Sequence, residues 1–319
     1  MLGITIAVRS GSWFSVWIGL ELNLMSFIPL ILIKDNQYSS EAALKYFLIQ
    51  ALGSTVLLIS AAIILIKFNI FSASLSAALL LKAGAAPFHS WFPPTLEGIL
   101  WPQALTLITV QKVAPISLLS YYVREQKVLI SISVILSALV GALGGLNQTL
   151  LRKLLAYSSI NHIAWMMSAL ILSERAWFLY FIIYSVIRAS VVLLLMSSQR
   201  YHFNHLIKHS ANKPAVKVII FIRLLSLGGL PPFTGFIPKW IIIQQLCSRD
   251  IFLLLFFLLG SSLFTLFYYL RMTLRSLTLR SFKTKWAFDT DYPNKVLFLA
   301  LTANLCGIFV PSLLTTTLI

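Results

Sequence analysis

Long apolar runs separated by short polar connections recur along the chain. A helix of about 20 apolar residues, rising 1.5 Å per residue, crosses the ~30 Å hydrocarbon layer of a membrane. Lipid offers the backbone no hydrogen-bond partners, and the alternating ten-residue segments of a barrel are absent, so the runs predict transmembrane helices. We expect about eleven spans, two of them short, near residues 12–33, 42–66, 72–88, 99–122, 128–146, 150–172, 176–196, 217–230, 233–247, 251–272 and 296–318.

Three segments depart from this pattern. Residues 1–8 form an apolar stub that is too short to cross a membrane and lacks the basic start of a signal peptide. Two polar stretches, 197–216 and 273–294, are too short to be domains of their own. We therefore predict one domain over residues 1–319, an all-α, polytopic bundle of transmembrane helices.

Composition agrees with a membrane protein. The chain is 59% hydrophobic and 11% charged, whereas soluble proteins are about half apolar and about a quarter charged. Too few polar residues are present to cover a water-facing surface. This excludes a cytosolic enzyme and a secreted disulfide scaffold.

The net charge of +16, from 25 basic and 9 acidic residues, limits the partners. Most basic residues stand at the ends of apolar runs, where they can reach phospholipid head groups, with cardiolipin as one candidate. No basic amphipathic face is present, so we expect no nucleic-acid partner. Because the basic residues divide evenly between alternating loops, they assign no membrane orientation.

The chain lacks the motifs that hold redox cofactors. Its two cysteines lie 59 positions apart without a C-x-x-C pair, which leaves no iron–sulfur or zinc site. Dinucleotide-, phosphate- and flavin-binding signatures are also missing. We expect no cofactor and no metal in this chain.

One acidic residue lies deep in a span. Glu21 is flanked by apolar residues on both sides, whereas the other eight acids lie at span borders or in loops. A charge at this depth costs ~3 kcal/mol or more, so we expect a partner or a water-filled cavity. Glu21 then has a proton or ion role, or it forms a buried hydrogen bond that only joins two helices.

Three lysines also lie in mid-span: Lys82, Lys112 and Lys239. Each is within five residues of a proline, which interrupts the helical hydrogen bonds and is typical of the discontinuous helices of transporters. Burial disfavours a charged lysine and a nearby carboxylate favours it, so movement or protonation of Glu21 would switch a lysine. The alternative for any single lysine is a side chain that extends to the membrane surface.

A weak internal repeat and one histidine add to this picture. Residues 87–93 match residues 232–238 in both prolines, the first phenylalanine and a second aromatic residue. Paired Pro-interrupted segments indicate two discontinuous helices in repeats around a midplane pathway. His162 is a candidate proton carrier if it lies near the lysines, although a lone helical histidine is more often a packing residue.

Five segments together carry a family resemblance: residues 17–30 (WIGLELNLMSFIPL), 80–93 (LLKAGAAPFHSWFP), 111–115 (QKVAP), 144–162 (GGLNQTLLRKLLAYSSINH) and 227–240 (LGGLPPFTGFIPKW). The chain resembles the antiporter-like membrane subunits of mitochondrial respiratory complex I, the NADH–ubiquinone oxidoreductase chain 2 family. That family is similar to Mrp-type cation/proton antiporter subunits, which implies an Mrp-like bundle with inverted repeats.

The resemblance implies a role for four residues. Glu21 corresponds to the family's key glutamate, which pairs with Lys82 in the first broken helix. Lys112 corresponds to the lysine of the central axis, and Lys239 to that of the second broken helix. We expect the Glu21 and Lys82 side chains to approach within ~3–6 Å, directly or through one water, in at least one state.

The resemblance also implies a setting. The chain would be a core membrane-arm subunit of the proton-pumping NADH:ubiquinone oxidoreductase in the mitochondrial inner membrane. Its partners would be the other membrane-arm subunits, and NADH, FMN, iron–sulfur clusters and ubiquinone would be bound by other subunits. Two alternatives remain: a stand-alone Mrp-type sodium/proton antiporter subunit and a purely structural membrane subunit. Because lysines outnumber the buried acid three to one, and sodium prefers carboxylates and carbonyls, the pattern favours protons.

Three features depart from the family. The stub of residues 1–8 replaces the helix that normally precedes the glutamate. Arg188 and Arg223 lie where neutral residues are expected. One hypothesis is that both arginines face the polar axis or a partner subunit. Another is that AGR codons, read as serine in many invertebrate mitochondria, were translated as arginine, and guanidinium density at Arg188 would exclude this second hypothesis.

Overall fold

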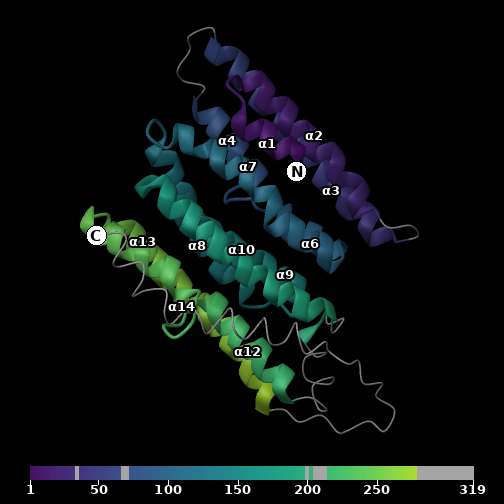
Figure 1. Cartoon of the computed structure of the whole chain (residues 1–319), viewed down its shortest axis with the longest axis vertical. Coiled ribbons are helices and arrows are strands. Elements are labelled where there is room, and N and C mark those ends of the chain that lie inside the picture. Colours follow the sequence, from purple (N-terminus) through teal and green to yellow (C-terminus); the bar gives the residue numbers. More distant parts are fainter. Residues whose placement is uncertain (33–35, 66–71, 198–200, 204–213, 279–319) are drawn as a thin grey trace.

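The computed structural model describes residues 1–32, 36–65, 72–197, 201–203 and 214–278, and these form a bundle of helices lying side by side (Figure 1). The only extended pairing among the described residues is an isolated bridge between Leu150 and His202. The helices are α1 (Leu2–Arg9), α2 (Trp13–Ile31), α3 (Gln37–Leu65), α4 (Ser72–Ala83), α5 (Phe92–Gly98), α6 (Trp101–Ile108), α7 (Val110–Leu119), η2 (Ser120–Tyr122), α8 (Lys127–Gly145), α9 (Leu151–Leu172), α10 (Glu174–Ser197), α12 (Pro214–Gly228), α13 (Phe236–Ser248) and α14 (Phe252–Thr278). The predicted all-α transmembrane bundle is confirmed.

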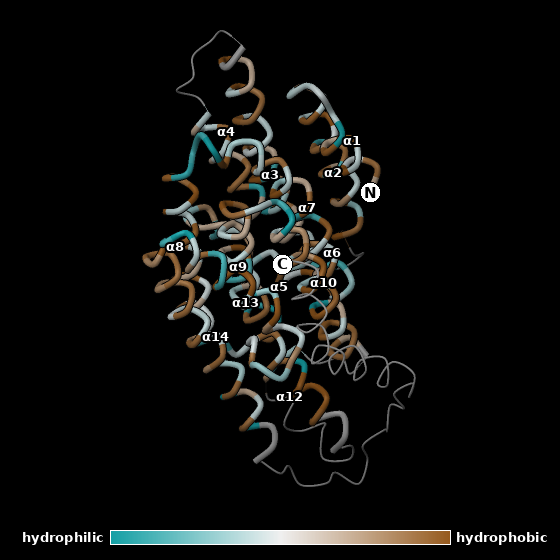
Figure 2. The backbone as a smooth tube through the Cα atoms, turned by 60° about the vertical axis from the view of Figure 1, so that its left-hand side comes forward, coloured by the Kyte–Doolittle hydropathy of each residue, from teal (hydrophilic) through white to brown (hydrophobic). Residues whose placement is uncertain are grey.

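Seven helical segments within the described ranges are long and apolar enough to cross a membrane. They are α2, α3, the segment Trp101–Tyr122 that contains α6 and α7, α8, α9, α10 and α14. Apolar residues follow the length of these helices (Figure 2). The predicted span at 296–318 lies outside the described residues.

Helices extend into both of the predicted polar loops. Helix α10 continues through Ser197, and α12 begins at Pro214, inside the stretch predicted as the first loop. Proline is tolerated in the first turn of a helix because the N–H it lacks would have no intrahelical partner there. Helix α14 runs on to Thr278, into the second predicted loop. The rest of both stretches lies outside the described residues, apart from 201–203.

The two predicted discontinuous helices are present, and both break in the same way. Helix α4 ends before Gly84 (φ 74°) and α12 before Gly229 (φ 81°), the left-handed conformation that glycine adopts without strain. The N–H of the residue after each glycine donates to the carbonyl five positions back, Leu80 in the first break and Leu225 in the second. This is the helix-ending pattern known as a Schellman motif. The short helix α5 follows the first break, and the short helix α13 follows the second.

Helix α9 is the centre of the bundle. It packs against α5, α8, α10, α13 and α14, and most of its side chains are buried, including the polar Ser158, Asn161 and His162. The Asn161 amide donates to the Ser261 carbonyl of α14 at 3.3 Å. A central helix with polar side chains surrounded by apolar helices places hydrogen-bonding groups in the middle of the bundle.

The N-terminal stub is a helix packed tightly on α2. A Cβ atom at Gly3 would lie 2.6 Å from the Gly19 carbonyl oxygen, and one at Gly19 would lie 2.7 Å from the Ala7 nitrogen. Small residues allow this close approach of two backbones, as in membrane helix pairs. Helix α1 also contacts α7, so it packs on both helices.

Candidate functional site

Lys82 is the penultimate residue of α4, two residues before Gly84 at the first helix break, and it is 6% exposed. The stem of the side chain packs against Gly53 of α3, where a Cβ atom would lie 3.0 Å from Lys82 Cγ. The Gln50 amide of α3 donates to the Lys82 carbonyl at 3.3 Å, which satisfies a carbonyl near the helix end. Helix α3 thus both leaves room for the lysine and fixes its backbone.

Lys112 lies in α7 and is almost fully buried, with 2% of its surface exposed. Its ammonium nitrogen lies 4.5 Å from the centroid of the Phe92 ring, a cation–π distance. No hydrogen-bond acceptor among the described residues contacts this nitrogen. An aromatic ring face stabilises a cation less completely than a carboxylate would, so the charged form of Lys112 is only partly compensated.

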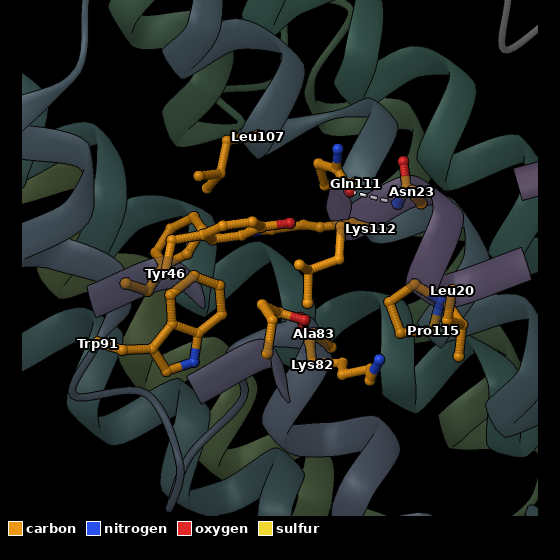
Figure 3. A pocket seen from close by; sticks show the side chains of 13 residues that line it. Leu20, Asn23, Tyr46, Lys82, Ala83, Trp91, Leu107, Gln111, Lys112 and Pro115 are labelled. Atoms are coloured by element: carbon orange, nitrogen blue, oxygen red, sulfur yellow. Dashed lines mark hydrogen bonds between the residues drawn. The ribbon is translucent and has the colours of Figure 1, made fainter. Parts of the chain in front are cut away.

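Lys82 and Lys112 line one small cavity (Figure 3). Its volume is about 20 Å³, and a cavity of roughly 10–15 Å³ or more can hold one water molecule if polar partners are present. Polar partners are present, because Gln50, Asn23 and Gln111 line the same cavity. The site can therefore place a single water between helices that carry two of the predicted lysines.

Asn23 and Gln111 form a polar link between α2 and α7 at this cavity. The Asn23 amide donates to the Gln111 side-chain oxygen at 2.5 Å (Figure 3). Neither residue was predicted as part of the site. Their positions offered a signal, since Asn23 stands two residues after Glu21 and Gln111 directly precedes Lys112.

Glu21 is half-buried on α2, and its Oε2 atom contacts no hydrogen-bond donor among the described residues. Its negative charge acts on Lys82 from within electrostatic reach. The two ion pairs of the described residues, Lys45–Glu41 and Lys153–Glu97, do not include Glu21. A direct or water-bridged contact between Glu21 and Lys82 stays a prediction.

Lys239 follows Pro238 in the first turn of α13 and is buried. Its ammonium nitrogen donates to the Gly228 carbonyl at 2.8 Å, across the second helix break. This carbonyl is at the C-terminus of α12, where the helix dipole favours a positive charge. The lysine packs so closely that a Cβ atom at Gly229 would lie 2.9 Å from Lys239 Cδ.

His162 lies in the middle of α9, inside the bundle. Its Nδ1 is 2.8 Å from the Tyr180 hydroxyl, and its ring centroid is 4.8 Å from that of Tyr184. It is within electrostatic reach of both Lys112 and Lys239. His162 is therefore affected by the charges of two lysines that lie far apart in the sequence. The tyrosines were missed, although their spacing of four residues puts both on one face of α10.

Arg188 lies one helical turn beyond Tyr184 on that face and is fully buried. Its guanidinium donates to the Ser158 hydroxyl at 2.7 Å and to the Leu155 carbonyl at 3.3 Å, and it lies 5.2 Å from the Tyr184 ring centroid. These contacts place it on the polar interior side of α10. Arg223 of α12 is also buried.

The five predicted residues fall into two overlapping groups. Lys82 and Lys112 share a cavity, and Glu21 acts on Lys82. His162 lies within reach of Lys112 and Lys239. Such a set of titratable groups can hold and pass protons, because each amine or imidazole both accepts and donates one. Among the described residues, no group of three or more His, Cys, Asp or Glu could hold a metal ion.

Comparison with known proteins gives consistent matches over most of the chain. The family profile described as NADH:quinone oxidoreductase/Mrp antiporter, TM matches residues 10–265. A chain named NADH-ubiquinone oxidoreductase chain 2 from Anopheles gambiae is 43% identical over 97% of this chain and 92% of its own length. A chain from the solved respiratory complex I of Thermus thermophilus is 25% identical, with a TM-score of 0.84 over 97% of this chain and 76% of that chain. A chain of the Mrp complex from a Dietzia species shares the fold alone, at 19% identity and a TM-score of 0.79 over 91% of this chain and 60% of that one.

Proposed function

The chain belongs to the NADH-ubiquinone oxidoreductase chain 2 family, and on this premise we propose that Glu21, Lys82, Lys112, His162 and Lys239 relay protons across the membrane. The protein is a proton-pumping, multi-pass subunit of the membrane arm of respiratory complex I, NADH:ubiquinone oxidoreductase. Its partners are other subunits of that arm.

The setting beyond this is also part of the proposal. We place the subunit in the mitochondrial inner membrane. Electrons would pass from NADH through FMN and iron–sulfur clusters to ubiquinone in other subunits. This chain would receive only the conformational or electrostatic consequence of that transfer and convert it into proton movement.

The observation that carries the proposal is the burial of three lysines without a paired carboxylate. Lys82, Lys112 and Lys239 are 6%, 2% and 5% exposed, and none forms one of the ion pairs of the described residues. An unpaired buried charge is costly, so a membrane protein that only needed stable packing would gain by replacing it with an apolar residue. Retained buried amines therefore favour a role that uses their proton.

The relay would work through charge repulsion between its members. Two positive charges roughly 8 Å apart repel each other by about 2 kcal/mol at an effective dielectric constant near 20. Simultaneous protonation of two neighbouring sites is therefore unfavourable. A proton that arrives at one end lowers the proton affinity of the next group, which passes its own proton onward.

Glu21→Gln tests the first step of the relay. The amide keeps the shape of the side chain but removes both its negative charge and its ability to take up a proton. A rise of about 1.4 kcal/mol in the barrier of the coupled step slows that step about tenfold. Proton uptake into sealed vesicles, measured per NADH oxidised and at a matched amount of assembled complex, reports the effect.

Glu174→Gln provides the matched control for this variant. Glu174 lies in the exposed first turn of α10 and undergoes the same chemical change. We expect wild-type pumping from it. Equal pumping by wild type and Glu21→Gln would show that the charge at position 21 plays no part in proton movement.

A further inference from the structure

A second cavity lies at one end of the bundle, apart from the lysines. Its volume is about 230 Å³, and its lining includes Asn147, Gln148 and Thr149 of the α8–α9 connection, Phe203, and Arg271 and Arg275 of α14. Backbone contacts shape it. The Arg271 guanidinium donates to the Leu146 carbonyl, and the Phe203 N–H donates to the Thr149 carbonyl at 3.1 Å.

The charge of this end of the bundle is unbalanced. Arg275 is exposed and stands one helical turn after Arg271, so both guanidinium groups lie on the same face of α14. The described acidic side chains at this end, Glu41 and Glu97, are already paired with lysines at 2.5 and 2.7 Å. A cavity with two arginines and three polar neighbours is therefore left with an excess of positive charge.

Exposed leucines stand close to the lining residues along α8 and α14. Leu143, in the last turn of α8, is 56% exposed, and Leu274, adjacent to Arg275, is 53% exposed. The cavity thus combines a cationic, hydrogen-bonding recess with exposed apolar side chains beside it. A ligand that fits both needs an anionic head and an apolar tail.

We propose that this cavity binds the phosphate head group of an acidic phospholipid, with the acyl chains against the exposed leucines of α8 and α14. Arginine binds phosphate oxygens in a two-pronged geometry, and the amide and hydroxyl groups of residues 147–149 supply further donors. The lipid would fasten the α8–α9 connection to α14 at the ends of two spans. This site is separate from the proposed proton relay, so either proposal can fail without the other.

The test uses the assembled complex and a photoactivatable phosphatidic acid whose reactive group is near the phosphate. We expect labelling of the peptides that contain residues 147–149 and 271–275, and weak labelling by the matching phosphatidylcholine probe. Each basic residue near a membrane surface contributes about 1 kcal/mol to binding an anionic lipid, so Arg275→Gln should reduce labelling about fivefold. Arg275→Lys should restore most of it, and Arg124→Gln, the same change at an exposed arginine at the opposite end, should leave it unchanged.

Four results would overturn the proposal. Equal labelling by the phosphatidylcholine probe would indicate only an apolar surface. Complete competition by millimolar inorganic phosphate would indicate a site for the free ion. A cross-link from these peptides to an acidic loop of a neighbouring subunit, in place of lipid labelling, would indicate that the cavity is a protein interface. Unchanged labelling of Arg275→Gln would show that Arg275 does not contribute to lipid binding.

Discussion

Replacing Lys239 by methionine is expected to stop proton translocation through this chain while leaving the chain assembled. Methionine is close to lysine in length and volume, so it can fill the space beside Gly229 where the lysine stem packs. The variant loses the buried amine at the second helix break, which in the proposed relay carries the proton there. The Gly228 carbonyl also loses its 2.8 Å donor, which costs about 1–3 kcal/mol of stability and is not enough to unfold a large buried bundle.

The measurement is proton pumping by reconstituted complex, expressed per NADH oxidised, together with the amount of complex recovered. Lys127→Met is the matched control, because Lys127 is exposed at the start of α8 and lies outside the relay. Wild-type pumping combined with poor assembly would support a purely structural subunit.

Gly235→Ala is expected to be the most disruptive glycine-to-alanine substitution among the described glycines. It would act on the second helix break. A Cβ atom there would lie 1.7 Å from the Ser226 carbonyl oxygen and 2.8 Å from its carbonyl carbon. Both belong to the backbone of α12, so no side-chain rotation relieves the overlap and α13 must move away. Since Lys239 lies one helical turn after Gly235, the same shift moves its ammonium group from the Gly228 carbonyl.

Overpacking of this kind usually costs about 1–3 kcal/mol, and a backbone overlap should reach the upper end or exceed it. We expect less assembled complex, a lower temperature of inactivation and lost pumping in what remains. Gly260→Ala is the matched control, because its added methyl group would meet nothing within 4 Å. Similar stability of the two variants would contradict the tight contact between Gly235 and α12.

Much of the fold could be predicted from sequence because lipid leaves the backbone few choices. An apolar run of sufficient length must be helical, which is why α2, α8 and α9 lie within a few residues of their predicted bounds. The end of α4 was harder to place. Hydrophobicity continues through Ala85 and Ala86, so the predicted span ran to residue 88, whereas the left-handed Gly84 ends the helix at Ala83.

The candidate site was predictable only in part. A charged residue in lipid is conspicuous, so the lysines and Glu21 could be selected without a structure. Uncharged polar residues such as Asn23 and Gln111 are common in spans and gave no comparable signal. The contact between Lys239 and the Gly228 carbonyl crosses a chain reversal, and no sequence spacing indicates which carbonyl a lysine will cap.

The number of protons moved per NADH oxidised by complex carrying Lys112→Arg tests the central claim most directly. Arginine keeps the positive charge beside Phe92, and the cavity of about 20 Å³ next to position 112 gives room for the larger side chain. Arginine does not release its proton in proteins, so it can hold the charge but cannot pass the proton on. A proton relay predicts that this ratio falls as far in Lys112→Arg as in Lys112→Met. A wild-type ratio in Lys112→Arg would show that the position requires only a fixed positive charge, and the relay through Lys112 would be wrong.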